Sequence, residues 1–238
     1  MNIRGLQRFT MVDYPGKMAG VIFTGGCNFR CPYCHNPCLV FDPESQPLIR
    51  ESEVLAFLRS RIGKLDGVVI SGGEPTLQAD LPDFAAEIKK LGYCVKLDTN
   101  GSMPEVVAAM VDAGTVDALG VDYKGPADDY NRISGCDLPD LAARVHRVLQ
   151  YATSHHVLLD VRTTVHQALL PPEKLREMRA ELDELGIRLW TLQQFHPVEI
   201  INDELLKIPT YTDLELLRLA KSLGGTTKVR GLKGVYLE

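Results

Sequence analysis

Short apolar runs alternate along this chain with longer segments in which apolar residues recur every three or four positions. We predict buried strands at the apolar runs, which cover 20–24, 68–71, 95–98, 118–122, 158–164 and 188–194. The periodic segments predict amphipathic helices over 51–61, 81–91, 104–113, 138–154, 172–185 and 213–223. Glycines follow several of these segments directly, as at Gly92 and Gly186, where helices commonly stop.

Strand and helix repeat about six times, which predicts parallel βαβ units in an α/β fold. A closed eight-unit barrel usually takes about 250 residues, so six units with longer loops suit a chain of 238 residues. We therefore expect an open, partial (β/α)₆ barrel, with a doubly wound sheet as the alternative. We also expect one domain over residues 1–238, in which segment 1–18 packs on the barrel.

Each predicted strand ends in polar or reactive residues. From these ends the chain continues through Cys27–Cys38, Ser71–Pro75, Asp98–Gly101, Asp122–Lys124, the pair Arg162 and Thr163, and Gln193–His196. In parallel barrels and sheets the carboxyl ends of the strands meet on one rim, where ligands bind. The sequence therefore predicts one large polar site on that rim.

Composition and charge narrow the functions that such a site could serve. The net charge is −5 and 45% of the residues are hydrophobic, and there is no basic run of the kind that binds nucleic acid. No apolar stretch reaches the roughly 20 residues needed to span a bilayer, and the first residues contain no apolar signal core. We expect a cytoplasmic protein that binds neither nucleic acid nor membrane.

Four of the six cysteines lie close together after the first predicted strand. In the reducing cytoplasm such clustering indicates metal or redox chemistry rather than disulfides. Cys27, Cys31 and Cys34 have the spacing C-x₃-C-x₂-C in the loop 25–38, so one loop can supply three thiolates to one metal centre. Spacing alone also allows a fully ligated ferredoxin-like cluster or a structural zinc site whose fourth ligand is Cys38 or His35.

The cysteine spacing, with Tyr33 before the third cysteine, resembles the signature of the radical S-adenosylmethionine (SAM) superfamily. This resemblance implies that Cys27, Cys31 and Cys34 bind three irons of a [4Fe–4S] cluster and that SAM binds the fourth iron. Cys38 is then a bystander. The remaining cysteines are isolated: we predict Cys94 as a buried strand residue and assign no role to Cys136.

Gly72-Gly73-Glu74-Pro75 resembles the motif that receives the methionine end of SAM in the same superfamily. Glycine lets a backbone approach a ligand closely, and Glu74 would accept hydrogen bonds from the ammonium group of SAM. The same residues would also suit an ordinary strand-to-helix turn with an acidic residue in its first turn. The motif gains specificity from its place one βα unit after the cysteine loop.

Two further strand ends, segments 96–101 and 121–124, resemble those of glycyl-radical-enzyme activases, a family within the superfamily. The resemblance implies that Asp98 and Asp122 lie beside SAM and help to hold a monovalent cation, with Thr99 at the same site. Asp98 would otherwise cap a local turn.

The same resemblance implies that Lys124, Arg162 and His196 lie around SAM. Lys124 and Arg162 would balance the carboxylate of SAM or a carbonyl group of the substrate. His196 would bond the ribose or the sulfonium side. Without the resemblance, the first two are rim salt-bridge partners and the third is a loop histidine.

Segment 6–17, residues 34–37 and the tail 228–232 resemble one branch of the activases, the activating proteins of anaerobic ribonucleoside-triphosphate reductase. This implies that SAM cleavage gives a 5′-deoxyadenosyl radical, which takes a hydrogen atom from a glycine Cα of a partner glycyl radical enzyme. Because the sequence has no second cysteine-rich run, we expect a single cluster, and the resemblance implies that a flavodoxin or a ferredoxin-type donor reduces it. A radical SAM enzyme acting on a small molecule, such as a queuine-type lyase, and a zinc-stabilised binding module are the alternatives.

Overall fold

The predicted strands lie side by side in one eight-stranded sheet. The structure is a computed structural model that describes residues 1–234, and within them the strands are adjacent in chain order. Strands β2 to β8 run parallel, whereas β1 is antiparallel to β2. The strands are β1 (Ile3–Thr10), β2 (Ala19–Thr24), β3 (Gly67–Gly72), β4 (Cys94–Thr99), β5 (Ala118–Asp122), β6 (Leu158–Val165), β7 (Leu189–Gln194) and β8 (Thr226–Arg230).

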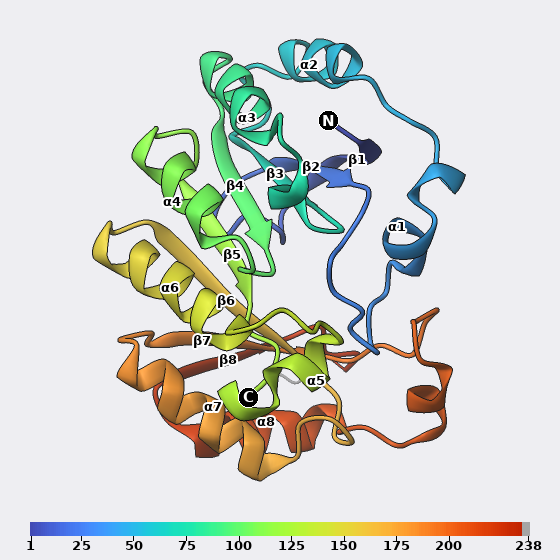
Figure 1. Cartoon of the computed structure of the whole chain (residues 1–238), viewed down its shortest axis with the longest axis vertical. Helices are drawn as coiled ribbons and strands as arrows, with labels where there is room; N and C mark the ends of the chain where they lie inside the picture. Colours follow the sequence, from blue (N-terminus) through green and yellow to red (C-terminus); the bar gives the residue numbers. More distant parts are fainter. Residues whose placement is uncertain (235–238) are drawn as a thin grey trace.

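Helices follow the strands, and α3, α4, α6 and α7 lie along one side of the curved sheet, with α1 on the other (Figure 1). The α-helices are α1 (Pro37–Phe41), α2 (Glu51–Arg59), α3 (Leu81–Lys90), α4 (Pro104–Asp112), α5 (Tyr130–Ser134), α6 (Leu141–Ser154), α7 (Pro172–Glu184) and α8 (Asp213–Leu223). Short 3₁₀ turns are η1 (Pro43–Ser45), η2 (Pro75–Leu77), η3 (Ala127–Asp129) and η4 (Asp203–Lys207). Within residues 1–234, no helix combines the length and the apolar character that crossing a bilayer requires.

The arrangement confirms the predicted α/β fold. The six predicted strands are β2 to β7, and their ladders connect neighbours in chain order, as in an open (β/α)₆ sheet. The sheet ends at β1 on one edge and at β8 on the other. The doubly wound alternative is wrong, because its strand order reverses at a switch point and this order does not.

Both edge strands lie where the periodicity predicted none. Segment 1–18 contributes β1, so it joins the sheet instead of only packing on it, and part of the tail forms β8. The sequence pattern does not predict β1 as a strand, because Gln7, Arg8 and Phe9 are all exposed and interrupt the apolar alternation. Pairing with the neighbouring strand, rather than an apolar pattern of its own, decides the structure of such an edge.

The loop that follows β1 fills one end of the space inside the curved sheet. Tyr14 is buried there in a small apolar cluster with Ala19, Val21, Val69 and Ala118. Ala19, Val21 and Val69 lie near the amino ends of β2 and β3. Apolar side chains therefore fill the space inside the curved sheet at the amino ends of its strands.

Alternate residues along the parallel strands face opposite sides of the sheet. On β5, Leu119 and Val121 belong to the main apolar core, together with helix residues such as Leu149. Gly120 and Asp122 alternate with them and face the inside. The helix side of the sheet is therefore apolar, and the inside beyond Tyr14 is available for polar groups.

Candidate functional site

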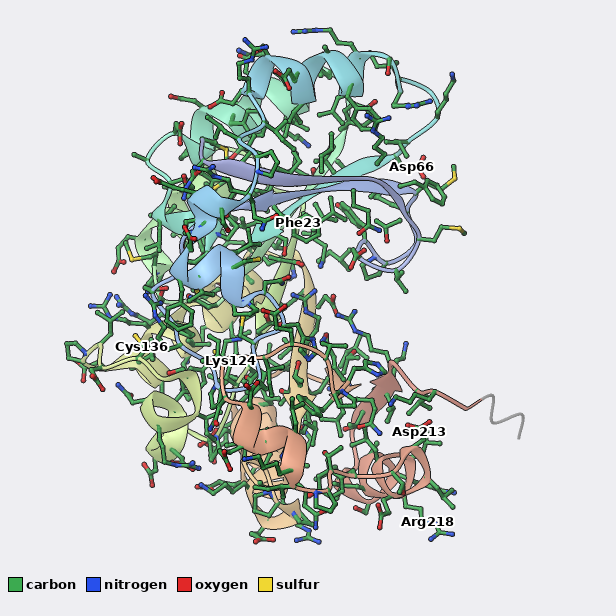
Figure 2. All side chains as sticks on the ribbon, turned by 90° about the vertical axis from the view of Figure 1, so that its right-hand side faces the viewer. Phe23, Asp66, Lys124, Cys136, Asp213 and Arg218 are labelled. Atoms are coloured by element: carbon green, nitrogen blue, oxygen red, sulfur yellow. The ribbon has the colours of Figure 1, made fainter. Side chains whose placement is uncertain are left out.

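A cavity of about 240 Å³ lies at the carboxyl ends of the parallel strands. Loops after β2, β3, β4 and β5 supply most of its wall, and Lys124 lies between α1 and η4 when the molecule is viewed from their side (Figure 2). The structure thus brings the predicted strand ends to one site. The predicted site residues that line it are Cys27, Cys31, Tyr33, Cys34, Gly72, Gly73, Glu74, Asp98, Thr99, Asp122 and Lys124.

The cavity wall also contains residues that the sequence analysis did not assign to the site. Phe29 and Asn36 lie within the cysteine loop, and Val40 follows it in α1. Thr164 lies two positions beyond Arg162 on β6 and therefore faces the same side of the sheet. Strand alternation was the signal that could have found it.

Hydrogen bonds anchor the cysteine loop to distant parts of the chain. The amide of Arg30 donates to the carbonyl of Ser134 at 3.0 Å, and the amide of Asn202 donates to the carbonyl of Pro32 at 2.9 Å. The side chain of Asn28 also donates to the Ser102 hydroxyl at 2.9 Å. These three hydrogen bonds fix the position of the cysteine loop.

Cys27, Cys31 and Cys34 carry free thiols on the cavity wall, whereas Cys38 lies in α1 and does not line the cavity. Burial raises the pKa of Cys27 to about 11 and that of Cys31 to about 12. Both thiols therefore stay protonated near neutral pH until a metal displaces the protons.

The arrangement of these thiols suits an iron–sulfur cluster. Cys27, Cys31 and Cys34 line one cavity, and His35 lines it as well. A structural zinc site requires four ligands on one ion, whereas cluster thiolates bind through separate irons. Three loop thiols facing one cavity meet the second requirement.

Gly72 and Gly73 let the end of β3 lie directly against the start of the cysteine loop. Gly72 has φ of +120°, and a Cβ there would be 2.2 Å from the amide nitrogen of Thr24. A Cβ on Gly73 would be 2.0 Å from the carbonyl oxygen of Gly26, which accepts a hydrogen bond from the Glu74 amide at 2.8 Å. The glycines therefore permit a close approach between two protein backbones.

Glu74 is fully buried and caps η2. Its Oε1 accepts from the Thr76 amide at 3.1 Å and from the Thr99 hydroxyl at 2.7 Å, and its Oε2 accepts from the Asn100 amide at 2.7 Å. Burial raises the pKa of this carboxyl, and the hydrogen bonds oppose the rise. A carboxylate oxygen can accept two bonds, so Oε2 keeps one acceptor position for a cationic donor.

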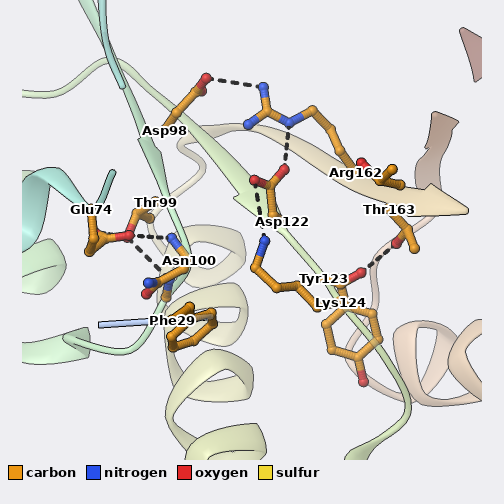
Figure 3. Close-up of polar contacts among 12 residues, drawn as sticks. Phe29, Glu74, Asp98, Thr99, Asn100, Asp122, Tyr123, Lys124, Arg162 and Thr163 are labelled. Carbon is orange, nitrogen blue, oxygen red and sulfur yellow. Dashed lines mark hydrogen bonds and ion pairs between the residues drawn. The ribbon is translucent and has the colours of Figure 1, made fainter. Parts of the chain in front are cut away.

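A chain of ion pairs connects the ends of β4, β5 and β6 (Figure 3). The Arg162 guanidinium contacts Asp98 through Nη1 and Asp122 through Nε, both at 3.1 Å. Lys124 Nζ lies 3.7 Å from Asp122 and about 6 Å from the ring centres of Phe29 and Tyr33. Although burial alone would raise the pKa of Asp122, Arg162 and Lys124 lower it to about 2, so it remains a carboxylate.

Two of the predicted site residues do not line the cavity. Arg162 lies behind Asp98 and Asp122, which it contacts. His196 lies beside the C-terminal segment instead, where a Cβ on Gly231 would be 3.1 Å from its Nε2. Arg162 therefore contacts two carboxylates that line the cavity wall.

Further charged residues lie deeper inside the sheet, and the sequence analysis missed them as a group. Lys96 is fully buried and pairs with Asp98 and Asp160. Arg162 and Arg230 also face Asp160, at 3.7 and 4.0 Å. Lys96 and Asp98 are two positions apart on β4, and so are Asp160 and Arg162 on β6, which places these four side chains on the inner face of the sheet. This spacing was the signal that could have predicted the group.

A model of the radical SAM superfamily matches residues 21–186 of the chain. A protein of Methanocaldococcus jannaschii, provisionally named a glycyl-radical enzyme activating enzyme, is 30% identical over 92% of this chain and 90% of its own length. Pyruvate formate-lyase-activating enzyme of Staphylococcus aureus is 35% identical over 104 residues, which are 42% of this chain and 41% of that enzyme.

Solved structures share the fold at low sequence identity. Streptococcus suis SuiB bound to its precursor peptide SuiA has a TM-score of 0.65 and 16% identity, over 89% of this chain and 48% of that chain. The chain thus spans about half the length of SuiB. TYW1 with a lysine-pyruvate adduct bound has a TM-score of 0.60 and 16% identity, over 86% of this chain and 72% of that chain.

Proposed function

Because this chain belongs to the radical SAM superfamily, we propose that it cleaves SAM reductively and takes a hydrogen atom from a glycine Cα of a partner glycyl radical enzyme. The observation that carries the proposal is the meeting of three loop thiols, the Gly72–Glu74 turn and the charged strand ends at one cavity. Similarity over 92% of the chain to a relative provisionally named an activating enzyme supports the choice of an activase.

Cys27, Cys31 and Cys34 would hold one [4Fe–4S] cluster. Cluster and SAM, when bound, supply a one-electron cleavage of the C5′–S bond of SAM and so a carbon radical that can take a hydrogen atom. The chain supplies binding and orientation. Burial of Cys31, together with Tyr33 beside it, limits the access of water to this wall.

Polar groups around the cavity would orient the methionine end of SAM. Oε2 of Glu74 has a free acceptor position for the ammonium group. Lys124 lines the cavity and would face the carboxylate of SAM. Its contacts with Asp122 and with the rings of Phe29 and Tyr33 hold it in place. These groups fix the ligand before reaction, which is how orientation lowers a barrier.

The partner that we propose is anaerobic ribonucleotide reductase, and the electron donor is a flavodoxin or a ferredoxin-type protein. The resemblance of segment 6–17 and of the tail to one activase branch supports this partner. We further propose that the chain acts in the cytoplasm as a single radical SAM domain.

The test begins with anaerobic reconstitution of the wild type and of Cys31→Ala. We expect about four irons per wild-type chain and release of 5′-deoxyadenosine when dithionite and SAM are added. Cys31→Ala should lose both, while the matched control Cys94→Ala, on β4 away from the cavity, should keep both. Turnover in Cys31→Ala at the wild-type rate would overturn the cluster assignment.

The partner is tested separately by adding anaerobic ribonucleotide reductase from the same organism. We expect an organic radical by electron paramagnetic resonance, with splitting by the one remaining glycine Cα hydrogen. If SAM is cleaved but no radical forms on the reductase, the activase proposal fails for this partner. Product formation from a small molecule alone would favour a lyase-type reaction instead.

A further inference from the structure

Asp98 and Asp122, the two carboxylates expected beside a monovalent cation, already face cationic side chains on every oxygen. Oδ1 of Asp98 contacts Lys96 Nζ, and its Oδ2 contacts Arg162 Nη1 at 3.1 Å. Oδ1 of Asp122 contacts Arg162 Nε at 3.1 Å, and its Oδ2 lies 3.7 Å from Lys124 Nζ. A cation that approaches any of these oxygens would also lie close to a side chain of the same charge, and the repulsion disfavours its binding. The residues present therefore fit the expected cation poorly.

The end of the Lys96 side chain lies in space that is free because residue 120 is a glycine. Lys96 is fully buried, and Gly120 lies beside it on β5, paired with Asp98 in the ladder between β4 and β5. A Cβ at Gly120 would be 2.7 Å from Lys96 Nζ and 2.1 Å from Asp98 Oδ1. Only glycine at this position lets the lysine and the carboxylate meet across the inside of the sheet.

Charge balance at this network leads to the same conclusion. Among the described residues, the network contains four cationic side chains, Lys96, Lys124, Arg162 and Arg230, and three carboxylates, Asp98, Asp122 and Asp160. The excess of one positive charge equals the charge of one ligand carboxylate. An additional cation would raise this excess to two positive charges, which one ligand carboxylate would not balance.

We propose that Lys96 is a positioning residue that takes the place of a monovalent cation, so that this chain binds SAM without K⁺ or Na⁺. Lys96 holds Asp98 against Arg162, and Arg162 in turn holds Asp122 beside Lys124. This inference rests on the proposed SAM site. It concerns how the site is neutralised and not which substrate reacts there.

The experiment measures the equilibrium Kd for SAM of the reconstituted protein under anaerobic conditions, in chloride salts of K⁺, Na⁺ or choline at equal ionic strength. We expect the wild type to bind with the same Kd, within about twofold, in all three salts. Lys96→Ala should bind about tenfold more weakly in choline, because Asp98 and Asp160 then lose the fully buried cation that they share. Since alanine leaves room for a small ion, K⁺ or Na⁺ should restore the affinity of this variant.

Two further variants separate charge from structure. Lys96→Met removes the charge but fills the space, so its affinity should stay low in every salt. Lys90→Ala removes an exposed lysine that pairs with Glu87 at the surface and should behave as the wild type. Sodium-23 relaxation gives a readout independent of turnover: ion binding should appear in Lys96→Ala and not in the wild type.

Wild-type affinity that rises tenfold or more with K⁺ would overturn the inference while leaving the proposed function intact. Equal affinity of Lys96→Ala and wild type in choline would overturn it as well. The wild-type comparison needs no variant, so the inference can be refuted even if Lys96→Ala does not fold. A wild type that binds no SAM in any salt would overturn the proposed function, and the inference with it.

Discussion

Replacing Gly120 by alanine should destabilise the fold, because the new methyl group would enter the space in which Lys96 and Asp98 meet. The new Cβ would be 2.1 Å from Asp98 Oδ1 and 2.7 Å from Lys96 Nζ. Relief of this clash requires the carboxylate to move by about 1 Å or more. Such a shift separates Asp98 from Arg162 or from Lys96, because both contacts hold it in its present place.

The magnitude follows from two costs that act together. Overpacking a buried site costs about 1–3 kcal/mol, and breaking a buried ion pair on one side costs about 3–5 kcal/mol. Relaxation relieves part of both, so we expect Gly120→Ala to lose about 3 kcal/mol. That is a large share of the roughly 5–15 kcal/mol by which most domains are stable.

The assay is urea unfolding of the metal-free protein, followed by the fluorescence of Trp190, the single tryptophan of the chain, with linear extrapolation to water. Gly20→Ala is the matched control, since it lies on β2 and its nearest neighbour to an added Cβ is 3.4 Å away. We expect it to change stability by less than about 1 kcal/mol.

Equal stability of Gly120→Ala and Gly20→Ala would refute the reasoning. A double-mutant cycle with Lys96→Met tests the mechanism itself. If the new methyl group acts through the ion pair, the two substitutions should be non-additive by at least about 1 kcal/mol. Additive effects would mean that the methyl group acts on something other than Lys96.

Three further predictions concern the cavity wall. Lys124→Met keeps the packing of the side chain but removes its charge, and it should weaken the equilibrium binding of SAM about tenfold. Gly73→Ala should reduce the iron content after reconstitution by more than about half, because its Cβ meets the Gly26 carbonyl oxygen at 2.0 Å and displaces the cysteine loop. Since burial raises the pKa of Glu74 above 4.5, folding takes up protons just above that pH, and stability should fall as pH rises through this window. Glu74→Gln should abolish that fall, which urea unfolding at several pH values measures.

The fold was largely predictable because its main elements bury one apolar face. In α6, Leu141, Val145, Val148 and Leu149 repeat with helical spacing and all are buried. No such signal exists for β8 (Thr226–Arg230), in which no residue is fully buried. Its structure depends on a neighbour that lies far away along the chain.

The candidate site, too, could be predicted only in part from the sequence. Polar residues at strand ends could be assigned to one rim, because parallel strands place their carboxyl ends together. The sequence does not tell how those residues pair. Arg162, for example, contacts Asp98 and Asp122, and this pairing depends on Lys96 and on the absence of a side chain at Gly120.

The charged residues on the inner face of the sheet are better explained by a role in ligand binding than by a contribution to the stability of the fold. The interior of a parallel barrel is usually filled by Val, Ile and Leu, and apolar replacement of a buried ion pair is often neutral or stabilising. Lys96, Asp98, Asp160 and Arg162 therefore contribute little net stability to the fold. What they do contribute is a fixed arrangement of charge beneath the cavity, with one positive charge in excess. A zwitterionic ligand with a carboxylate needs such an arrangement in place before it binds, since charges fixed in advance need no reorganisation during the reaction.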